Sequence, residues 1–326
     1  MRAIVIREPG GPEVLELREV PTPEPSRGEV RVRVRATAVN RADLLQRLGA
    51  YPAPPGSPAD VPGLEIAGEV DAVGDGVTEF AGGERVFGLV GGGAYADAVL
   101  VHARTLARIP SGLTFTDAAA VPEAFVTAWD AMVEQGHLSA GDTVLVHAVG
   151  SGVGTAGLQL ARAVGAVVLG TSRTQAKIDR ARELGLPFGI VVEQSAFADA
   201  VMTRTVGRGV DVVLELVGGG YISEDLTCLA PRGRIIVVGA MAGREAALDV
   251  TLLMRKRATI RGTVLRSRPL EEKILAAIVL ERRIVPLLAS GAVRSVVDRV
   301  LPLSQAAEAH RLMQSNATFG KIVLQM

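Results

Sequence analysis

The chain has 326 residues, with 35 Lys and Arg against 35 Asp and Glu, 48% apolar residues and one cysteine. This length predicts about two domains of ~150 residues, each large enough to bury a core. The balanced charge offers no basic surface for nucleic acid or an acidic membrane. With Cys228 as the only thiol, an intramolecular disulfide and a zinc site with two or more thiolates are both excluded.

The first eight residues alternate in a strand pattern and carry charges at Arg2, Arg7 and Glu8, so they lack the apolar core of a signal peptide. The most apolar stretch, 143–158, is too short and too rich in glycine to span a bilayer. We therefore expect a cytoplasmic protein with no membrane segment.

Up to about residue 120, short β-type runs alternate with turns rich in Pro and Gly, which predicts a compact, barrel-like β domain. The expected strands are 3–6, 14–20, 29–38, 66–73, 85–89 and 94–101, and the Pro-rich stretch 52–62 is expected to be a loop. From residue 118 the apolar residues follow helical spacing, which predicts a helix over 118–135. A side-chain oxygen of Thr116 or Asp117 can cap its start. A second domain is expected to begin at this point.

After this helix, β and α patterns alternate, which predicts βαβ units and a doubly wound parallel sheet. The expected strands are 143–148, 166–170, 209–216, 234–238 and 259–264, and the expected helices are 155–164, 175–184, 222–229 and 269–283. Strand patterns at 295–300 and 321–324 flank a helix at 304–314, and we expect this tail to rejoin the first domain. The predicted fold is α/β, with one domain over 1–121 and 286–326 and the other over 122–285.

A Gly-x-Gly-x-x-Gly pattern at Gly152, Gly154 and Gly157 lies between an expected strand and an expected helix. Glycines there let the backbone approach a pyrophosphate, whose charge meets the free N–H groups of the helix. The alternative is a Gly-rich turn without a ligand, but the strand–turn–helix context favours a dinucleotide site. The candidate cofactor residues of this loop are Gly150, Ser151, Gly152, Val153 and Gly154.

About 20 positions further on, an acidic side chain would bond the ribose 2′-hydroxyl of NADH. This chain instead has Ser172 and Arg173, followed by Lys177. With no carboxylate to repel a 2′-phosphate, the hydroxyl and the two cations favour NADPH. The alternative is that Arg173 and Lys177 only solvate a helix face.

Segments along nearly the whole chain resemble the zinc-independent medium-chain dehydrogenases/reductases, and within them the NADPH:quinone oxidoreductases. They are residues 38–44 with 49–51, 62–68, 119–124, 149–154, 265–268 and 320–324. The Gly-Ser-Gly-Val-Gly loop and the Leu-Arg-Ser segment resemble the stress-inducible branch most. The resemblance implies a GroES-like catalytic domain and a Rossmann domain, with hydride transfer to quinones or activated alkenes in a cleft between them. It also implies a homodimer joined through the edge strand 259–264.

The departures from the zinc-using relatives concern the metal ligands. Those relatives carry a histidine in a Gly-His-Glu segment, and this chain has Leu64 at that place and no cysteine near Asn40. Leucine cannot ligate a metal, and Glu65 alone cannot fill a tetrahedral site. We therefore expect no metal in the protein.

By the same resemblance, Asn40 and Tyr51 line the site near the nicotinamide. We expect the Tyr51 hydroxyl to hydrogen-bond the acceptor oxygen as negative charge develops, with Asn40 as a second donor or a positioning group. The alternatives are an aromatic cap on the Pro-rich loop for Tyr51 and a turn-forming amide for Asn40. Asp43 is expected to orient Arg41 or a loop N–H.

Further candidate contacts follow from the family segments. Those to the cofactor are Thr127, Gly239, Met241, Leu265, Arg266, Ser267 and Asn316, and Glu123 is expected to face the same site. The four histidines, Cys228 and the basic run 255–257 are expected to be structural or solvated. The rival functions are a 2-enoyl thioester reductase and a non-catalytic NADPH-binding sensor or RNA-binding protein.

Overall fold

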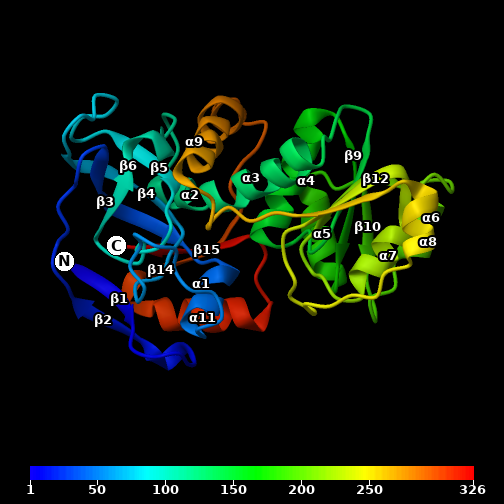
Figure 1. The fold of residues 1–326 in the computed structure, drawn as a ribbon, viewed down its shortest axis with the longest axis horizontal. Helices are drawn as coiled ribbons and strands as arrows, with labels where there is room; N and C mark the ends of the chain where they lie inside the picture. The colour runs from blue at the N-terminus through cyan, green and yellow to red at the C-terminus, as the bar shows by residue number, and fades with distance from the viewer. The chain divides into compact units, whose positions relative to one another are not determined.

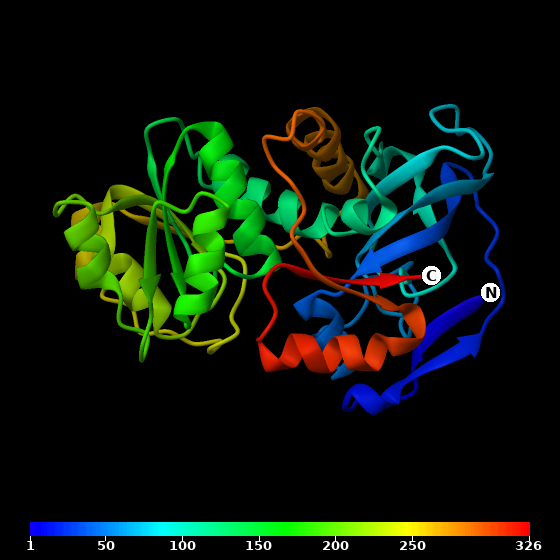
Figure 2. The ribbon, with the colours of Figure 1, turned by 180° about the vertical axis from the view of Figure 1, so that it is seen from behind.

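The computed structural model describes all 326 residues and divides into two compact units. Unit 1 comprises Met1–Val126, Leu265–Gly291 and Ser295–Met326, and unit 2 comprises Thr127–Val264 and Ala292–Arg294. Both termini lie in unit 1 (Figures 1 and 2). No helix combines the length and the apolar character that a bilayer crossing requires.

Unit 1 is built on a seven-stranded sheet of order β14-β15-β3-β4-β5-β7, in which β6 also pairs with β3. The strands are β3 (Glu29–Ala38), β4 (Glu65–Val73), β5 (Arg85–Leu89), β6 (Ala98–His102), β7 (Leu106–Arg108), β14 (Val297–Pro302) and β15 (Lys321–Gln325), and a separate antiparallel pair is formed by β1 (Arg2–Ile6) and β2 (Leu15–Glu19). Along β3, Val30, Val32 and Val34 are buried while the arginines between them face outward, as period-2 alternation predicts.

The helices of unit 1 come from the N-terminal part of the chain and from its C-terminal tail. They are η1 (Pro12–Val14), α1 (Arg41–Arg47), η2 (Ala103–Thr105), α2 (Phe115–Ala119), α9 (Leu270–Val279), η4 (Leu280–Ile284), α10 (Val285–Ala289), η5 (Leu303–Gln305) and α11 (Ala306–Ser315), and α3 (Pro122–Trp129) begins in this unit. The α11 helix, red in Figure 2, packs against β14 and β15. The tail therefore does rejoin the β-rich unit.

The structure differs from the expected boundaries around α2 and α9. Thr114, rather than Thr116 or Asp117, caps the helix, because its Oγ1 accepts the Asp117 N–H at 3.1 Å. The single helix expected over 118–135 is divided, since Pro122 begins α3 and η3 (Asp130–Gln135) is π-helical. The segment Leu265–Gly291 belongs to unit 1, because α9 packs against β5, β7 and η2.

Unit 2 contains a six-stranded, entirely parallel sheet of order β10-β9-β8-β11-β12-β13, which confirms the doubly wound prediction. The strands are β8 (Thr143–Val146), β9 (Val167–Ser172), β10 (Phe188–Val191), β11 (Val210–Glu215), β12 (Leu229–Val237) and β13 (Thr259–Gly262), and the helices are α4 (Gly152–Val164), α5 (Gln175–Glu183), α6 (Ala198–Arg204), α7 (Tyr221–Cys228) and α8 (Val250–Lys256). The strand order reverses between β8 and β11. Ligands of such sheets bind at the carboxyl ends of the strands beside this switch point.

Several elements had no prediction from the sequence. They are α1, α6, α8, α10, β7 and β10, with the short helices η1 and η2. The basic run 255–257 lies at the end of α8, and Cys228 is fully buried in α7, so both agree with the structural roles expected for them.

Candidate active site

Three strands of unit 1 bring a lysine and a glutamate together. Because β3 is antiparallel to both β4 and β15, its C-terminal end lies beside the first residues of these two strands. Those first residues are Glu65 and Lys321, and the Lys321 ammonium lies 2.7 Å from Glu65 Oε1. Both side chains are buried. An ion pair removed from water is stable only when further hydrogen bonds satisfy its remaining polar atoms.

Asn40, just beyond the end of β3, supplies part of that hydrogen bonding. Its Nδ2 donates to Glu65 Oε1 at 2.8 Å and to Ala38 O at 3.1 Å, and its Oδ1 accepts from Lys321 Nζ at 2.5 Å. Both amide hydrogens are therefore used within the protein. Of the two roles expected for Asn40, this geometry favours positioning over donation to an acceptor.

Asp43 orients the loop that precedes Glu65. Its carboxylate accepts the N–H of Asn40 at 2.8 Å and of Gly63 at 3.1 Å, and the hydroxyl of Tyr95 at 3.2 Å. Burial raises the pKa of Asp43 to about 6. Gly63 has φ +104°, and a Cβ added there would lie 2.6 Å from the Tyr95 ring, so glycine is required. These contacts agree with the role expected for Asp43 as a group that orients a loop N–H.

Tyr51 is half-buried and is held by Arg266. The Arg266 guanidinium carbon lies 5.2 Å from the centre of the Tyr51 ring, and Nη1 donates to the Tyr51 carbonyl at 3.3 Å. The same guanidinium donates to Gly91 O at 2.8 Å and to Gln46 Oε1 at 2.5 Å. Burial raises the pKa of Tyr51, so the hydroxyl stays protonated. It makes no hydrogen bond within the protein and is available to a ligand.

A small pocket of unit 1 lies beside Arg266. It is lined by Leu64, Leu89, Val90, Glu123, Leu265, Arg266, Arg268, Lys273 and Ala276. Burial, together with the charge of Glu65, raises the pKa of Glu123 to about 8. The Glu123 N–H donates to Glu65 Oε2 at 2.8 Å, while the Glu123 carboxyl has no partner. At neutral pH the pocket wall therefore offers a protonated carboxyl among apolar and cationic side chains.

The residues at the position of a catalytic zinc do not fit that metal. Leu64 is buried and has no ligand atom. Glu65 is engaged on one oxygen by Lys321 and Asn40 and on the other by the Glu123 N–H. A zinc site needs at least three nitrogen, oxygen or sulfur ligands from the protein, and an ammonium group already supplies the positive charge here. No catalytic step through zinc follows from these residues.

In unit 2, the Gly-rich loop joins β8 to α4. The helix begins at Gly152, three residues earlier than expected, so Gly152, Val153 and Gly154 form its first turn. Ser151 caps the helix, since its Oγ accepts the Gly154 N–H at 3.0 Å. A Cβ added at Gly154 would lie 2.3 Å from Ala148 O, so the close approach of loop and helix requires glycine. The first N–H groups of a helix lack intrahelical acceptors and can receive a phosphate.

The residues expected to receive a 2′-phosphate lie at the carboxyl end of β9. Ser172 ends the strand and is buried, and Arg173 follows it and is exposed. Lys177 lies in the first turn of α5 and is half-buried. No carboxylate stands in this segment, so its charge is positive.

Gly239 and Met241 lie in the loop after β12, at the same edge of the sheet. The Gly239 N–H donates to Glu215 O at 3.3 Å, and the Ala242 N–H donates to Val217 O at 2.7 Å, which ties this loop to the loop after β11. Met241 is 53% exposed, although it is a large apolar residue. The loop therefore has an apolar side chain open to a ligand.

The other candidate contacts are distributed over both units. Thr127, on α3, is buried and belongs to unit 2. In unit 1, Leu265 is buried and Ser267 is exposed, and Asn316 is the left-handed cap of α11 and accepts a hydrogen bond from Arg41. Their contact with a cofactor stays a prediction.

No local sequence pattern predicts the buried ion pair. Lys321 and Glu65 are 256 residues apart, and only their shared position at the start of a strand marks them. From the sequence, Glu65 is only an insufficient zinc ligand, whereas in the structure it is the centre of a network that includes Asn40 and the start of α3.

Comparison with known proteins agrees with this geometry. Residues 26–111 match the alcohol dehydrogenase GroES-like domain, and residues 186–324 match the zinc-binding dehydrogenase model. The chain is 35% identical to the quinone oxidoreductase of Rattus norvegicus over 328 residues, which cover 99% of this chain and 97% of that protein.

Solved structures give the same result. The crystal structure of Escherichia coli quinone oxidoreductase complexed with NADPH matches with a TM-score of 0.90 and 29% identity, covering 100% of both chains. The crystal structure of 2-haloacrylate reductase matches with a TM-score of 0.85 and 32% identity, covering 100% of this chain and 99% of that chain. The chain therefore belongs to the medium-chain dehydrogenase/reductase family and, within it, to the quinone oxidoreductases.

Proposed function

We propose that the protein is an NADPH-dependent, zinc-independent oxidoreductase that transfers hydride to quinones or activated alkenes. The observation that carries this proposal is the carboxyl edge of the unit 2 sheet. There the Gly-rich first turn of α4 stands beside a segment with Ser172, Arg173 and Lys177 and no carboxylate. The names of two similar structures, one a quinone oxidoreductase with NADPH and the other a 2-haloacrylate reductase, support the cofactor and both acceptor classes.

Zinc independence is supported by the Glu65–Lys321 pair. A metal ion would need the Glu65 carboxylate as a free anionic ligand, but the Lys321 ammonium group is already paired with it. Without a Lewis acid, the acceptor must itself be electron-poor, as quinones and conjugated enones are.

The bound nicotinamide would supply the hydride, and the residues of this chain would manage the charge that develops on the acceptor. Arg266 holds the ring and the carbonyl of Tyr51, and the unpartnered Tyr51 hydroxyl would donate a hydrogen bond to the acceptor oxygen. The protonated Glu123 carboxyl is a second unpartnered donor in unit 1. The overall reaction takes a quinone, NADPH and one proton to a hydroquinone and NADP⁺. Asn40 would act through Lys321 and Glu65, as a positioning residue.

The proposal includes a homodimer. β13 (Thr259–Gly262) is the last strand of its sheet and pairs only with β12, so its outer edge is open. Pairing of two such edges around a two-fold axis would join two sheets and satisfy their backbone groups. Light scattering of the purified chain at a dimer mass would support this arrangement, and a monomer would refute it. The cytoplasmic location stays a prediction from the sequence.

Loss of nicotinamide absorbance tests the proposed reaction. The acceptors are 1,4-benzoquinone, 9,10-phenanthrenequinone, a conjugated enone and a crotonyl thioester, each with NADPH and with NADH. Quinone or enone turnover with NADPH preferred is the expected result. Turnover of the thioester alone would show a 2-enoyl thioester reductase, and saturable NADPH binding with no turnover would show a cofactor-binding protein without catalysis.

A further inference from the structure

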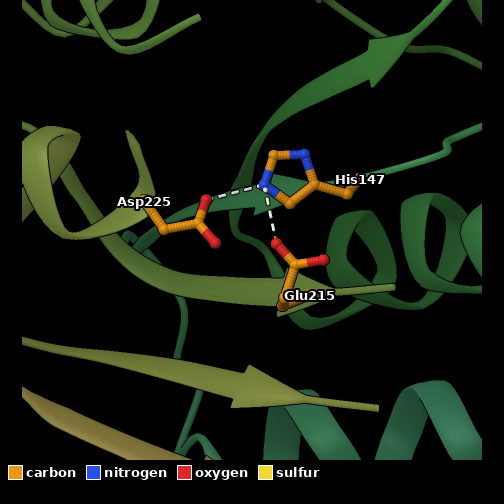
Figure 3. A group of neighbouring side chains, drawn as sticks. All are labelled: His147, Glu215 and Asp225. Atoms are coloured by element: carbon orange, nitrogen blue, oxygen red, sulfur yellow. Dashed lines mark hydrogen bonds and ion pairs between the residues drawn. The ribbon is translucent and has the colours of Figure 1, made fainter. Parts of the chain in front are cut away.

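Unit 2 contains a second buried polar cluster that the proposed chemistry does not use. His147 follows β8, Glu215 ends β11 and Asp225 lies on α7, and all three side chains are fully buried. Their nitrogen and oxygen atoms lie within 4.8 Å of one another. Figure 3 shows both carboxyl groups directed at the same ring nitrogen of His147.

Both ring nitrogens of His147 have a polar neighbour. Nε2 lies 2.7 Å from Asp225 Oδ1 and 3.6 Å from Glu215 Oε2, and Nδ1 lies 2.8 Å from Thr171 Oγ1. Burial lowers the pKa of His147 to about 4, so the ring is neutral at pH 7 and has one N–H. We assign that hydrogen to Nε2, which donates to Asp225, and the Thr171 hydroxyl then donates to Nδ1.

The two carboxyl groups have no cationic partner. Neither forms an ion pair with a lysine or an arginine, and Glu215 Oε2 and Asp225 Oδ2 have no hydrogen-bond partner although both are buried. Two buried carboxylates this close cannot both be ionised. Burial raises the pKa of Glu215 to about 8 and that of Asp225 to about 7, which leaves a proton in the pair at neutral pH. A proton shared by the two carboxyl groups would give both of these oxygens a partner.

The other oxygen of Glu215 holds a loop at the cofactor edge. Oε1 accepts the N–H groups of Val217 and Gly218, the latter at 2.8 Å. Gly218 has φ +73°, and a Cβ added there would lie 2.7 Å from Ala240 Cα, so the loops after β11 and β12 touch at this point. The Glu215 carbonyl also accepts the Val238 N–H at 2.8 Å.

His147 and its hydrogen-bond partner Thr171 connect the cluster to the other two cofactor segments. His147 stands three residues before Gly150, at the base of the Gly-rich loop. Thr171 directly precedes Ser172, and its carbonyl accepts the Val149 N–H at 2.9 Å. One cluster is thus linked to the Gly-rich loop, to the segment after β9 and to the paired loops after β11 and β12, which hold candidate cofactor residues of unit 2.

We propose that His147, Glu215 and Asp225 form a buried proton-sharing triad that positions the three cofactor-binding loops of unit 2, so that NADPH binding depends on side chains that do not touch it. This inference rests on the proposed function, because that function supplies the ligand. A bound metal ion is a different occupant of the same residues. The 2.7 Å separation of Nε2 and Oδ1 fits a hydrogen bond, whereas two ligands of one zinc ion at ~2.0 Å stand about 3.3 Å apart.

The titratable groups around the triad come from α7 and from the segment after β9. Tyr221, Glu224 and Cys228 face it from α7, and the ring of Tyr221 lies 4.9 Å from that of His147. Arg173, after β9, acts on Tyr221 rather than on the triad. Glu224 is a useful control, because its Oε2 accepts two backbone N–H groups, of Phe197 and Ala198, outside the cofactor loops.

Amide variants test the shared proton without any cofactor. In Glu215→Gln and in Asp225→Asn, the new N–H replaces the shared proton, so each single variant should unfold within about 3 °C of wild type. The double variant places two NH₂ groups face to face with no acceptor, and its loss of melting temperature should be several times the sum of the single losses. Additive losses would overturn the shared proton.

Removal of the loop acceptor tests the positioning role. Glu215→Ala should raise the NADPH dissociation constant and KM at least 10-fold while kcat at saturating NADPH changes less than 3-fold, and Glu215→Gln should restore both constants to near wild type. The control Glu224→Ala should leave NADPH affinity within 2-fold. Equal effects of the two alanine variants, or stoichiometric metal in the purified protein that His147→Ala loses, would overturn the inference. If wild type itself does not bind NADPH, the proposed function fails, and the melting temperatures still decide whether the proton is shared.

Discussion

Lys321 Nζ lies 2.7 Å from Glu65 Oε1, and both residues are buried. They begin β15 and β4, the two strands on either side of β3. Because Glu65 also accepts hydrogen bonds from Asn40 and from the Glu123 N–H, one ion pair connects the end of β3, the start of β4 and the start of α3. The Glu65 carboxylate, which zinc would need as a free ligand, is therefore already neutralised by Lys321.

Lys321→Met should lower the free energy of unfolding by about 3–5 kcal/mol, because it leaves a buried carboxylate without its cation. Urea unfolding measures this change. The double variant Glu65→Gln/Lys321→Met should recover part of the loss. The control is Arg104→Met, which removes a cation from an exposed pair with Glu271 at 3.4 Å and should cost no more than about 0.5 kcal/mol. Equal losses in Lys321→Met and Arg104→Met would contradict this account of the buried pair.

Stability should fall as the pH rises from 6.5 to 8.5. In the folded protein the pKa of Glu215 and that of Glu123 are raised to about 8 and that of Asp225 to about 7, whereas the unfolded carboxyls are already ionised at pH 6.5. The folded state therefore binds more protons, and each group removes at most about 1.4 kcal/mol of stability per pH unit in this window. Melting temperatures should show this slope, and Glu215→Gln should make it shallower. A rising or flat profile would show that these carboxyls are ionised in the fold.

Cofactor selectivity should depend on the cations after β9. Lys177→Ala and Arg173→Ala should each raise KM for NADPH about 10-fold and leave KM for NADH within 2-fold, because only NADPH has a 2′-phosphate. The matched control is Arg182→Ala, on the same helix, where the arginine pairs with Asp179 at 2.7 Å. Parallel losses with both cofactors, or the same loss in the control, would count against a 2′-phosphate site.

Tyr51→Phe should lower kcat for quinones about 10- to 100-fold with little change in KM for NADPH, because it removes one donor to the developing oxyanion. Tyr95→Phe is the control, since the Tyr95 hydroxyl is buried between Asp43 and His310 at 3.2 Å from each. That variant should lose stability rather than kcat. An unchanged kcat in Tyr51→Phe would contradict a catalytic role for the hydroxyl and would support the alternative, that Tyr51 is an aromatic cap on the Pro-rich loop.

The sequence predicted those parts of the fold that local patterns encode. The alternation of strand and helix patterns predicted the parallel sheet. The glycine spacing after β8 predicted the start of α4 to within three residues. The sequence does not predict the short α1, although Asn40 and Asp43 cap it, because Asn40 is expected there as a site residue or a turn-forming amide and not as a helix cap. Pro122 divides the helix expected over 118–135. The expectation of one helix relied on the helical spacing of apolar residues and gave Pro122 too little weight.

The buried clusters could not be predicted from the sequence. His147 showed no nearby partner, because Asp225 is 78 residues away and only the sheet topology brings them together. The same holds for Lys321 and Glu65. Local sequence shows which side chains can titrate, but long-range strand pairing decides which of them share a proton or an ion pair.

The most direct test of the central claim is oxidation of NADPH by 1,4-benzoquinone, with the protein dialysed against EDTA and its metal content measured. The account predicts hydroquinone and NADP⁺ in equal amounts, at a rate that neither EDTA nor added zinc changes by more than 2-fold. It also predicts a slower reaction when the transferred hydrogen of NADPH is deuterium. Activity that disappears with EDTA and returns with zinc, or no NADPH-dependent reduction of any quinone or enone, would contradict it.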